Sequence, residues 1–314
     1  MYFPFLRGKQ FELIALRDIS NKMSESKDKV SPIIEPVKDS STLKSTLRIL
    51  AVDNINFNVV LNPTVGDLQN DPSKIIDILN NELKDYSNYQ VAIIIEEKTT
   101  PKVILKLLKD SALNYKGITF IHYASREGIT DFITSIENDF TVINNIIHYG
   151  IIKSKRYYRE FESSTLVSLD DFFKAQSRNA DFLEIDDSAF SEEHLFFTKD
   201  GFKGFSDFLT IGENYSEAGF LPRAVAIHLS YMDSNKKMRV KHFVSDSNED
   251  TADIAGKFAE ALNKLIAWNT SEGKMTTVAT DKFSELHNTG HFPGLGTLKK
   301  LSAMHHIEIL LNNL

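Results

Sequence analysis

Short apolar runs alternate with segments of helical periodicity between residues 32 and 149. Runs of β-strand character occur at residues 32–37, 57–62, 91–96, 118–123 and 145–149. Two of the intervening segments open with Asp71-Pro72 and Thr100-Pro101, each an N-cap residue followed by a proline at the first helical position. The alternation predicts βαβ units and a parallel sheet. The nearly continuous apolar character of the strands predicts that both faces of the sheet are covered.

The regular alternation ends near residue 150. Residues 150–164 show no helical stripe, residues 165–170 predict a sixth strand, and residues 171–203 are ambiguous, with 181–185 compatible with either a strand or part of a helix. The stretch 204–231 contains two further strand-like runs, 207–211 and 224–231, on either side of a polar loop, and these supply a seventh and an eighth strand. Residues 238–244 predict a hairpin with 224–231, and helices are predicted over 250–268 and 296–314.

Up to eight strands in βα order predict an α/β (β/α)₈ barrel of the TIM type, irregular in its C-terminal half. Two features favour the alternative, a doubly wound open sheet. The link 213–223 is short for a parallel crossover, and the segment after the fifth strand lacks a clear helix. With no recognisable linker, we expect one barrel domain over 1–314. It comprises an N-terminal element (1–30), βα units (31–245) and C-terminal helices (250–314).

Composition and motifs exclude several classes of function. The net charge of −7 provides no global basic field for nucleic acid, and the absence of cysteine excludes disulfides, thiolate metal sites and cysteine nucleophiles. No signal peptide is evident at the N-terminus, and no apolar run approaches the roughly 20 residues that span a bilayer. We therefore expect a cytoplasmic protein that does not bind a membrane. The phosphate-binding GxxxxGK[ST], dinucleotide GxGxxG and hydrolase GxSxG motifs are all missing.

The first six predicted strands share a pattern in which apolar residues are followed by a polar or ionisable one. These residues are Glu35, Asn62, Glu96, His122, His148 and Asp170. In a parallel barrel they would converge on the mouth formed by the carboxyl ends of the strands, where such enzymes place their catalytic groups. Carboxylates and imidazoles there could act as acid and base, or bind a cation. The pattern does not identify a cofactor, and a divalent metal is among the candidates. The simpler alternative is that polar residues are common wherever a strand gives way to a loop.

His122 and His148 end neighbouring predicted strands. Adjacent parallel strands lie about 4.8 Å apart. If the register is level and both rings face inward, the two side chains could share a proton or a ligand, with at least one ring neutral. We therefore expect His148 to be required for activity and not for stability. Alternatively, His148 bonds to the neighbouring backbone and supports the fold.

Basic residues mark two further segments. Lys153, Lys155, Arg156 and Arg159 are interleaved with aromatic residues in 150–164, a composition that can bind phosphate and stack a base. The alternative is a solvated loop. Arg7, Lys9 and Glu12 form either an ion-pair network at one end of the barrel or an anion clamp. Together with Asn62 and Asp207, which could orient a neighbouring group, the basic residues Arg7, Lys9, Arg156 and Arg159 are candidates for substrate binding.

The remaining histidines are less informative. His228 lies among apolar residues in the run 224–231, where it is either a catalytic group or a hydrogen-bonded core residue. His305, His306 and Glu308 lack the His-Glu-x-x-His order of a zinc protease, and we interpret them as surface residues of the last helix.

Five pieces of the chain together resemble the Beta protein family, a group of largely uncharacterised bacterial and phage-related proteins. The pieces are LRGKQFELIAL (6–16), PIIEPVK (32–38), GFSDF (204–208), AIHLSY (226–231) and HFVSD (242–246). They span almost the whole chain. The resemblance implies a barrel-type α/β protein associated with mobile elements and phage defence. It carries over no catalytic residues, so the candidate residues rest on position and chemistry.

The sequence therefore favours a phage-defence-associated barrel enzyme that hydrolyses a phosphate-containing or nucleotide substrate. Glu35, Glu96, His122, His148, Asp170 and His228 are the catalytic candidates. A second hypothesis is a non-catalytic recognition module that binds a partner protein of a defence system or a phage component. A third is a single-strand nucleic-acid binder, which requires the loop 153–159 to be exposed.

Overall fold

The computed structural model describes residues 1–152, 157–217 and 221–314. Its contacts group into two compact units, whereas the sequence led us to expect one domain. The barrel unit comprises Met1–Asp171 and Glu193–Asp207, and the sheet unit comprises Phe172–Glu192 and Phe208–Leu314. None of the helices in the described ranges is long and apolar enough to cross a membrane.

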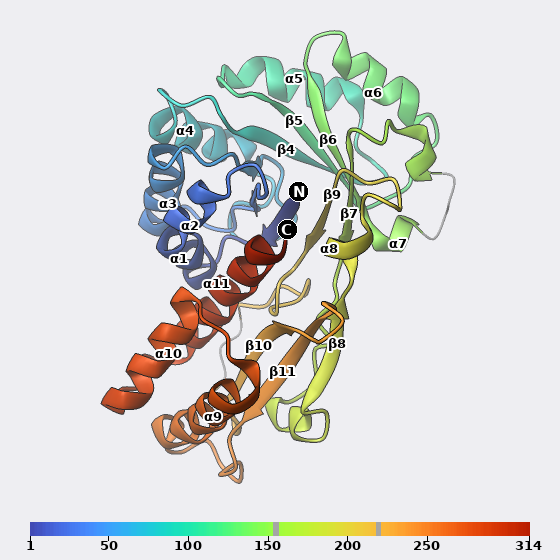
Figure 1. Ribbon diagram of the computed structural model, residues 1–314. Helices are drawn as coiled ribbons and strands as arrows, with labels where there is room; N and C mark the ends of the chain where they lie inside the picture. The colour runs from blue at the N-terminus through green and yellow to red at the C-terminus, as the bar shows by residue number, and fades with distance from the viewer. Residues whose placement is uncertain (153–156, 218–220) are drawn as a thin grey trace. The chain divides into compact units, whose positions relative to one another are not determined.

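The barrel unit contains a closed barrel of eight parallel strands with helices around it (Figure 1), which confirms the predicted (β/α)₈ fold and rules out the open sheet. Around the barrel the strands are β1 (Tyr2–Leu6), β2 (Ile33–Ile34), β3 (Asn58–Val60), β4 (Gln90–Ile95), β5 (Gly117–His122), β6 (Val142–His148), β7 (Leu166–Asp170) and β9 (Gly204–Asp207). Every residue of β4 and β5 is buried, as expected for strands covered on both faces.

The strand that closes the barrel differs from the prediction. Residues 224–231 were expected to be the eighth strand, but the opening segment supplies it instead, as β1, which pairs with β2 on one side and β9 on the other. Residues 226–232 form β10, which pairs antiparallel with β11 in a separate sheet. The closed barrel explains the difference, because β1 fills the position between β9 and β2 and leaves no free edge with which β10 could pair.

Helices follow most barrel strands, and Figure 1 shows α4, α5 and α6 outside β4–β6. They are α1 (Gln10–Asp18), α2 (Ser20–Glu25), α3 (Ser41–Val52), α4 (Pro72–Glu82), α5 (Pro101–Ser111), α6 (Ile129–Glu137), α7 (Tyr149–Ile152) and α8 (Glu193–Phe196), with a 3₁₀ turn η1 (Tyr157–Glu160). The predicted start of α4 is confirmed, since the Asp71 carboxylate accepts from the Lys74 N–H at 3.2 Å. Thr100 also precedes its helix, but no side-chain cap bond forms there.

The turn after β1 requires glycine. Gly8 has φ +62°, and a Cβ added there would lie 2.7 Å from the Glu35 carbonyl oxygen. The loop after β1 is therefore pressed against the end of β2, which brings Arg7 and Glu35 together.

The sheet unit is built on three antiparallel strands in the order β10 (Ala226–Met232), β11 (Met238–Val244) and β8 (Asp187–Ser191). The predicted hairpin between β10 and β11 is confirmed. The ambiguous region 171–203 supplies β8 and a 3₁₀ turn, η2 (Asn179–Leu183). The remaining helical elements are α9 (Ile254–Trp268), a π-helical turn η3 (Asn269–Gly273), α10 (Val278–Thr289) and α11 (Leu295–Asn313).

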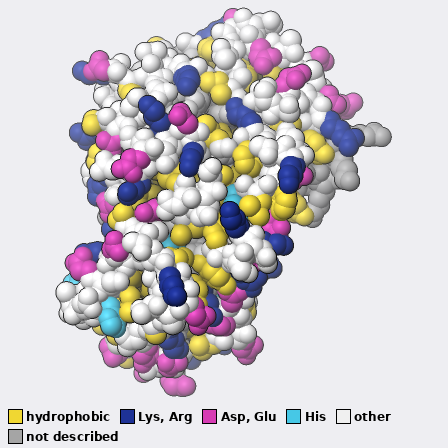
Figure 2. Space-filling view, in the orientation of Figure 1, with side chains coloured by type: hydrophobic (Ala, Val, Ile, Leu, Met, Phe, Trp, Pro, Cys, Tyr) yellow, Lys and Arg dark blue, Asp and Glu magenta, His cyan; other side chains and the backbone are white. Residues whose placement is uncertain are grey.

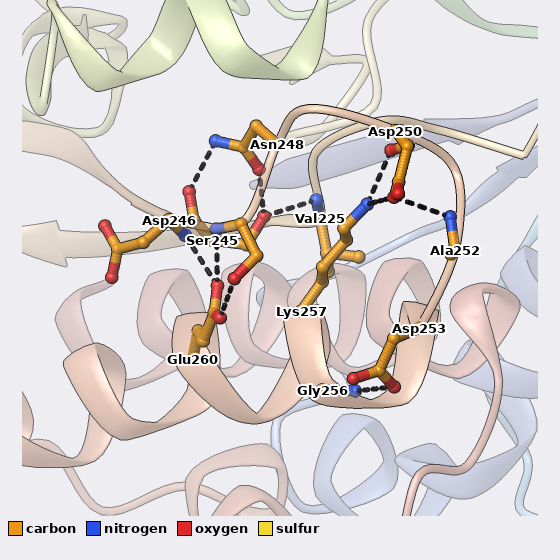
Figure 3. A network of polar contacts seen from close by, with 11 residues as sticks. Val225, Ser245, Asp246, Asn248, Asp250, Ala252, Asp253, Gly256, Lys257 and Glu260 are labelled. Atoms are coloured by element: carbon orange, nitrogen blue, oxygen red, sulfur yellow. Dashed lines mark hydrogen bonds and ion pairs between the residues drawn. The ribbon is translucent and has the colours of Figure 1, made fainter.

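A polar network fixes the loop between β11 and α9 (Figure 3). The buried Lys257 ammonium donates to the Asp250 carbonyl at 2.5 Å, while the Glu260 carboxylate accepts from the N–H groups of Asp246 and Ser247 at 2.7 and 2.9 Å. Asp253, with φ +41°, caps the helix by accepting from the Gly256 N–H at 2.9 Å. The acidic loop before α9 is thus held in place by Lys257 of that helix.

The polar residues of α11 are buried, which corrects their interpretation as surface residues. Residues 301–311 are buried without interruption, so the helix has no solvent face there. His305 bonds through Nε2 to the Ser230 carbonyl at 2.7 Å and through Nδ1 to Thr277 Oγ1 at 2.9 Å. The Glu308 carboxylate accepts from the Val278 N–H at 2.9 Å and so caps α10.

Candidate functional site

The six polar residues selected from the strand pattern lie at the carboxyl end of the barrel. Glu35 and Glu96 directly follow β2 and β4, Asn62 follows β3 by two residues, and His122, His148 and Asp170 are the last residues of β5, β6 and β7. These strands are parallel and adjacent around the barrel. We refer to this end of the barrel as the mouth.

The strand register separates His122 from His148. His122 pairs with Ile147, so His148 lies one position further along, level with Tyr123. Residues paired in register point to the same side of a sheet and successive residues to opposite sides, so the two histidines face opposite ways. The level register that would let the two imidazoles face each other is therefore absent, and the prediction of a shared proton or ligand is wrong.

His122 belongs to the outer wall of the barrel. On the same side of β5, Phe120 packs edge-on against Phe132 of α6, at 5.8 Å between ring centroids. His122 is fully buried, with Nδ1 3.0 Å from the Tyr157 hydroxyl and Nε2 3.1 Å from Asn145 Oδ1. Burial lowers the pKa of His122 to about 4, although the bond to Asn145 opposes the shift. These contacts give His122 a structural role.

Arg7 and Glu35 form a buried ion pair at the mouth. Glu35 is fully buried, and its carboxylate accepts from the Arg7 guanidinium and from the Thr64 N–H and Oγ1 at 2.6 and 2.9 Å. Arg7 also lies over the Phe5 ring, 5.4 Å from the centroid. Both charges are thus paired and hydrogen-bonded. The acidic member of the pair is Glu35, whereas the network considered from the sequence had Glu12 in that place.

Glu12 was grouped with Arg7 and Lys9 from the sequence but was not chosen as a catalytic or binding residue. It lies in the first turn of α1, after Lys9 at the N-cap position, and is almost completely buried. Burial raises the pKa of Glu12 to about 7, against the opposing effects of the Lys9 charge and of backbone bonds from Arg7 and Lys9. The signal in the sequence is its position three residues after the N-cap, where an acidic side chain folds back over the start of a helix.

Asn62 and Glu96 differ in their surroundings. The Asn62 side chain donates to the Ile94 carbonyl and accepts from the Ile94 N–H, both at 2.9 Å. It therefore continues the pairing of β3 with β4 beyond the end of β3. The Glu96 side chain is exposed, and its backbone N–H donates to Thr99 Oγ1 at 2.9 Å.

His148 and Asp170 bring an imidazole and a carboxyl group to adjacent strand ends. The His148 ring stacks on Tyr123, with centroids 4.8 Å apart and an interplanar angle of 20°, and its Nδ1 accepts from the Gly150 N–H at 3.2 Å. Burial raises the pKa of Asp170 to about 6. A bond from the Asp171 N–H and the charge of His148 oppose the shift, and Asp171 and Glu193 add to it. Asp170 can therefore hold or release a proton near neutral pH.

Glu193 and Asp207 supply further carboxyl groups near this part of the wall. The pKa of Glu193 is raised, mainly by burial, while the carboxylate accepts from Ser168 Oγ at 2.9 Å. Asp207, paired in register with Asp170, accepts from the Tyr2 hydroxyl at 2.8 Å. The sequence suggested that Asp207 orients a backbone group or an arginine, whereas this bond is to a tyrosine hydroxyl. Glu193 lay in the ambiguous region 171–203, so no strand position pointed to it.

The other candidate residues fall elsewhere. Arg156 lies outside the described residues, as do Lys153 and Lys155, and Arg159 is exposed in η1. His228 belongs to β10 of the sheet unit and not to a barrel strand, because the eighth strand was misassigned. On the face drawn in Figure 2, basic and acidic side chains are interspersed.

Two further observations concern ligands. Within residues 1–152, 157–217 and 221–314, no group of three or more His, Asp or Glu side chains is placed to hold a metal ion. A cleft of about 470 Å³ lies between the loops that precede β5 and β6, lined by residues that include Tyr115, Lys116, Glu137 and Asp139. This cleft is at the amino ends of the strands, the end of a barrel that serves stability.

Comparisons with known proteins yield no family. No family model and no curated protein matches the chain. Among solved structures, a crystal structure of ScGas2 in complex with compound 11 shares 13% identity with a TM-score of 0.33, and covers 87% of this chain. A second, of ScGas2 in complex with compound 6, shares 12% identity with a TM-score of 0.34 and covers 93%. In both cases this chain spans 66% of the length of the other.

Proposed function

We propose that this protein is a hydrolase whose reaction takes place at the barrel mouth, with Asp170 and His148 as its acid–base groups. The observation that carries the proposal is the raised pKa of Asp170, about 6, at the end of β7, where the charge of His148 at the end of β6 acts on it. His148 pairs with Leu169, so the two side chains start from opposite faces of the barrel wall and would meet at the rim of the mouth. A group that titrates near the working pH is populated in both of its protonation states. It can therefore donate a proton to a leaving group and regain one from water.

The proposed substrate is a phosphate ester or a nucleotide. Support comes from the sequence that follows β6, where Lys153, Lys155, Arg156 and Arg159 succeed His148 within eleven residues. Positive side chains of this kind neutralise the oxygens of a phosphoryl group. The Arg7–Glu35 pair, fixed by Thr64, would shape the opposite part of the mouth and not bind the anion, because Glu35 already engages the Arg7 guanidinium. Membership of the Beta protein family, with its association with phage defence, remains a proposal that rests on the five sequence pieces.

The test is hydrolysis of p-nitrophenyl phosphate and bis(p-nitrophenyl) phosphate between pH 4 and 9, with and without Mg²⁺ or Mn²⁺. Asp170→Asn should lower kcat/KM by about 10²–10⁴-fold with its melting temperature within a few degrees of wild type. His148→Ala should show a loss of the same order. Asp110→Asn, an exposed change on α5, is the matched control and should leave the rate unchanged. Hydrolysis of either ester at the wild-type rate by folded Asp170→Asn protein would contradict the proposal.

A second candidate is the non-catalytic recognition module. It is favoured by how many of the selected polar groups are already engaged: Glu35 by Arg7 and Thr64, Asn62 by Ile94, and His122 by Tyr157 and Asn145. In this case neither ester is hydrolysed by the wild-type protein under any of the conditions above.

A further inference from the structure

We propose that Ser188, His242 and His228 form a second catalytic site, in the sheet unit, that cleaves carboxylic esters through an acyl-serine intermediate. The site is independent of the barrel mouth. Ser188 is the nucleophile, His242 the general base, and His228 the positioning residue that orients His242.

The three side chains form a continuous hydrogen-bonded row. Ser188 Oγ lies 3.1 Å from His242 Nε2, and His242 Nδ1 lies 2.9 Å from His228 Nδ1. A serine hydroxyl on Nε2 of an imidazole whose Nδ1 is held by a third group is the arrangement of nucleophilic triads on several unrelated folds. Here the third group is an imidazole where the familiar triads have a carboxylate.

Regular sheet geometry sets this arrangement. His228 and His242 are directly opposite each other on β10 and β11, so their side chains leave the same face of the sheet. Ser188 lies on β8, the other neighbour of β11, level with Val240 and therefore two residues along β11 from His242. Each member of the row comes from a different strand of a rigid sheet, which favours a precise site.

Two phenylalanine rings fix the imidazoles. The Phe182 centroid lies 4.5 Å from each imidazole centroid, and the Phe173 centroid lies 5.1 Å from that of His228. His242 is buried, while Ser188 and His228 are partly exposed, so the row is not fully enclosed by the protein.

Hydrogen bonding restricts the protonation states. The two facing Nδ1 atoms share one proton. When this proton is on His242, His242 Nε2 has a free lone pair and accepts from the Ser188 hydroxyl, and the proton of His228 is on Nε2. Burial lowers the pKa of His242 to about 4 and that of His228 to about 3, so both rings are neutral at pH 7. The charged groups that act on the pair are Asp186, Asp187, Lys241 and Lys299.

The chemistry balances without a cofactor. Ser188 Oγ attacks the ester carbonyl carbon as its proton passes to His242 Nε2, and the same proton then protonates the departing alkoxide as the C–O bond breaks. Water then attacks the acyl-serine carbonyl carbon as one of its protons passes to His242 Nε2. The same proton returns to Ser188 Oγ as the acyl C–Oγ bond breaks, which releases the carboxylic acid.

The test uses a fluorophosphonate probe, which forms an Oγ–P bond with loss of fluoride, followed by intact-mass analysis and peptide mapping. Wild-type protein should gain one adduct, at Ser188, and Ser188→Ala should gain none. Ser191→Ala, on the same strand, is the matched control and should be labelled at the wild-type rate. An adduct elsewhere, equal labelling of Ser188→Ala, or no adduct where a reference serine esterase is labelled completely would overturn the proposal.

Two further variants test the roles of the histidines. His242→Asn should abolish labelling, and His228→Asn should slow it at least tenfold, whereas His228→Asp should restore much of the rate because a carboxylate also accepts from Nδ1–H. If His228 had only a structural role, His228→Asp would not restore the labelling rate. In wild-type protein the labelling rate should stay constant down to about pH 5 and fall through pH 4, where His242 becomes protonated. Ser188→Ala should leave phosphate-ester hydrolysis unchanged, and Asp170→Asn should leave labelling unchanged, so the two sites fail independently.

Discussion

At the scale of single residues, burial determines which ionisable groups change charge near neutral pH. The carboxyl groups of Asp170 and Glu12 have pKa values raised to about 6 and 7, whereas His122 and His305 both have pKa values lowered to about 4. The cause is the same in each case, since a low-dielectric surrounding disfavours the charged form. Buried carboxyl groups thus titrate where histidines usually do.

His122 provides a prediction on stability and pH. Its pKa is about 4 in the folded protein and about 6.5 in an unfolded chain, so the unfolded state binds one more proton between these values. Stability from the neutral ring is complete above pH 6.5 and is lost as the pH falls towards 4. From pH 7 to pH 5 the wild-type free energy of unfolding should fall by about 2 kcal/mol more than that of His122→Asn.

Urea denaturation at the two pH values measures this difference. His287→Asn, an exposed change on α10, is the control and should fall in parallel with wild type. An equal fall for wild type and His122→Asn would show that the His122 ring is protonated in the folded state.

At the scale of helices and strands, the pattern of apolar residues predicted most of the elements, the parallel barrel and the β10–β11 hairpin, but not the register of the strands. The polar residues that follow β2–β7 do lie at one end of the barrel, because parallel strands bring their carboxyl ends together. The pairing of His122 with Ile147 could not be foreseen from the sequence. A shift of one residue in the register leaves the apolar pattern unchanged but points the side chain to the opposite face of the sheet. Likewise, β10 has the composition of a barrel strand, and the sequence did not show that β1 takes the remaining place in the barrel.

The helix α9 gives a prediction at this scale. Its buried face packs on β10 and β11, where the rings of Tyr231 and Phe243 contact Trp268. The helix therefore covers the three-stranded sheet. Leu262 is 2% exposed, so Leu262→Ala should cost about 2–5 kcal/mol in chemical denaturation. Asn263→Ala, on the exposed side, should change stability by less than about 0.5 kcal/mol. A similarly small loss for Leu262→Ala would mean that this face is not packed.

At the scale of the whole chain, two compact units carry two separate sets of polar groups. The barrel unit has the strand-end residues with Asp170 and His148, and the sheet unit has the row Ser188–His242–His228. The sequence indicated the first set, because each member follows an apolar run. The row Ser188–His242–His228 could not be predicted from the sequence. Ser188 lies in the ambiguous region 171–203, and His242 becomes a candidate only because it lies opposite His228 in the sheet. Glu193 was missed for the same reason, as contacts and not periodicity bring it near Asp170.

The most direct test of the barrel-mouth account is an NMR titration of the Asp170 carboxyl carbon, assigned by comparison with Asp170→Asn. We predict a midpoint near pH 6, the value to which burial raises the pKa of this group. In His148→Ala the midpoint should move higher, because the His148 charge that opposes the shift is gone. A midpoint near 3.9, the ordinary value for aspartate, that is unaffected by His148→Ala would contradict the assignment of Asp170 and His148 as the acid–base groups of the site.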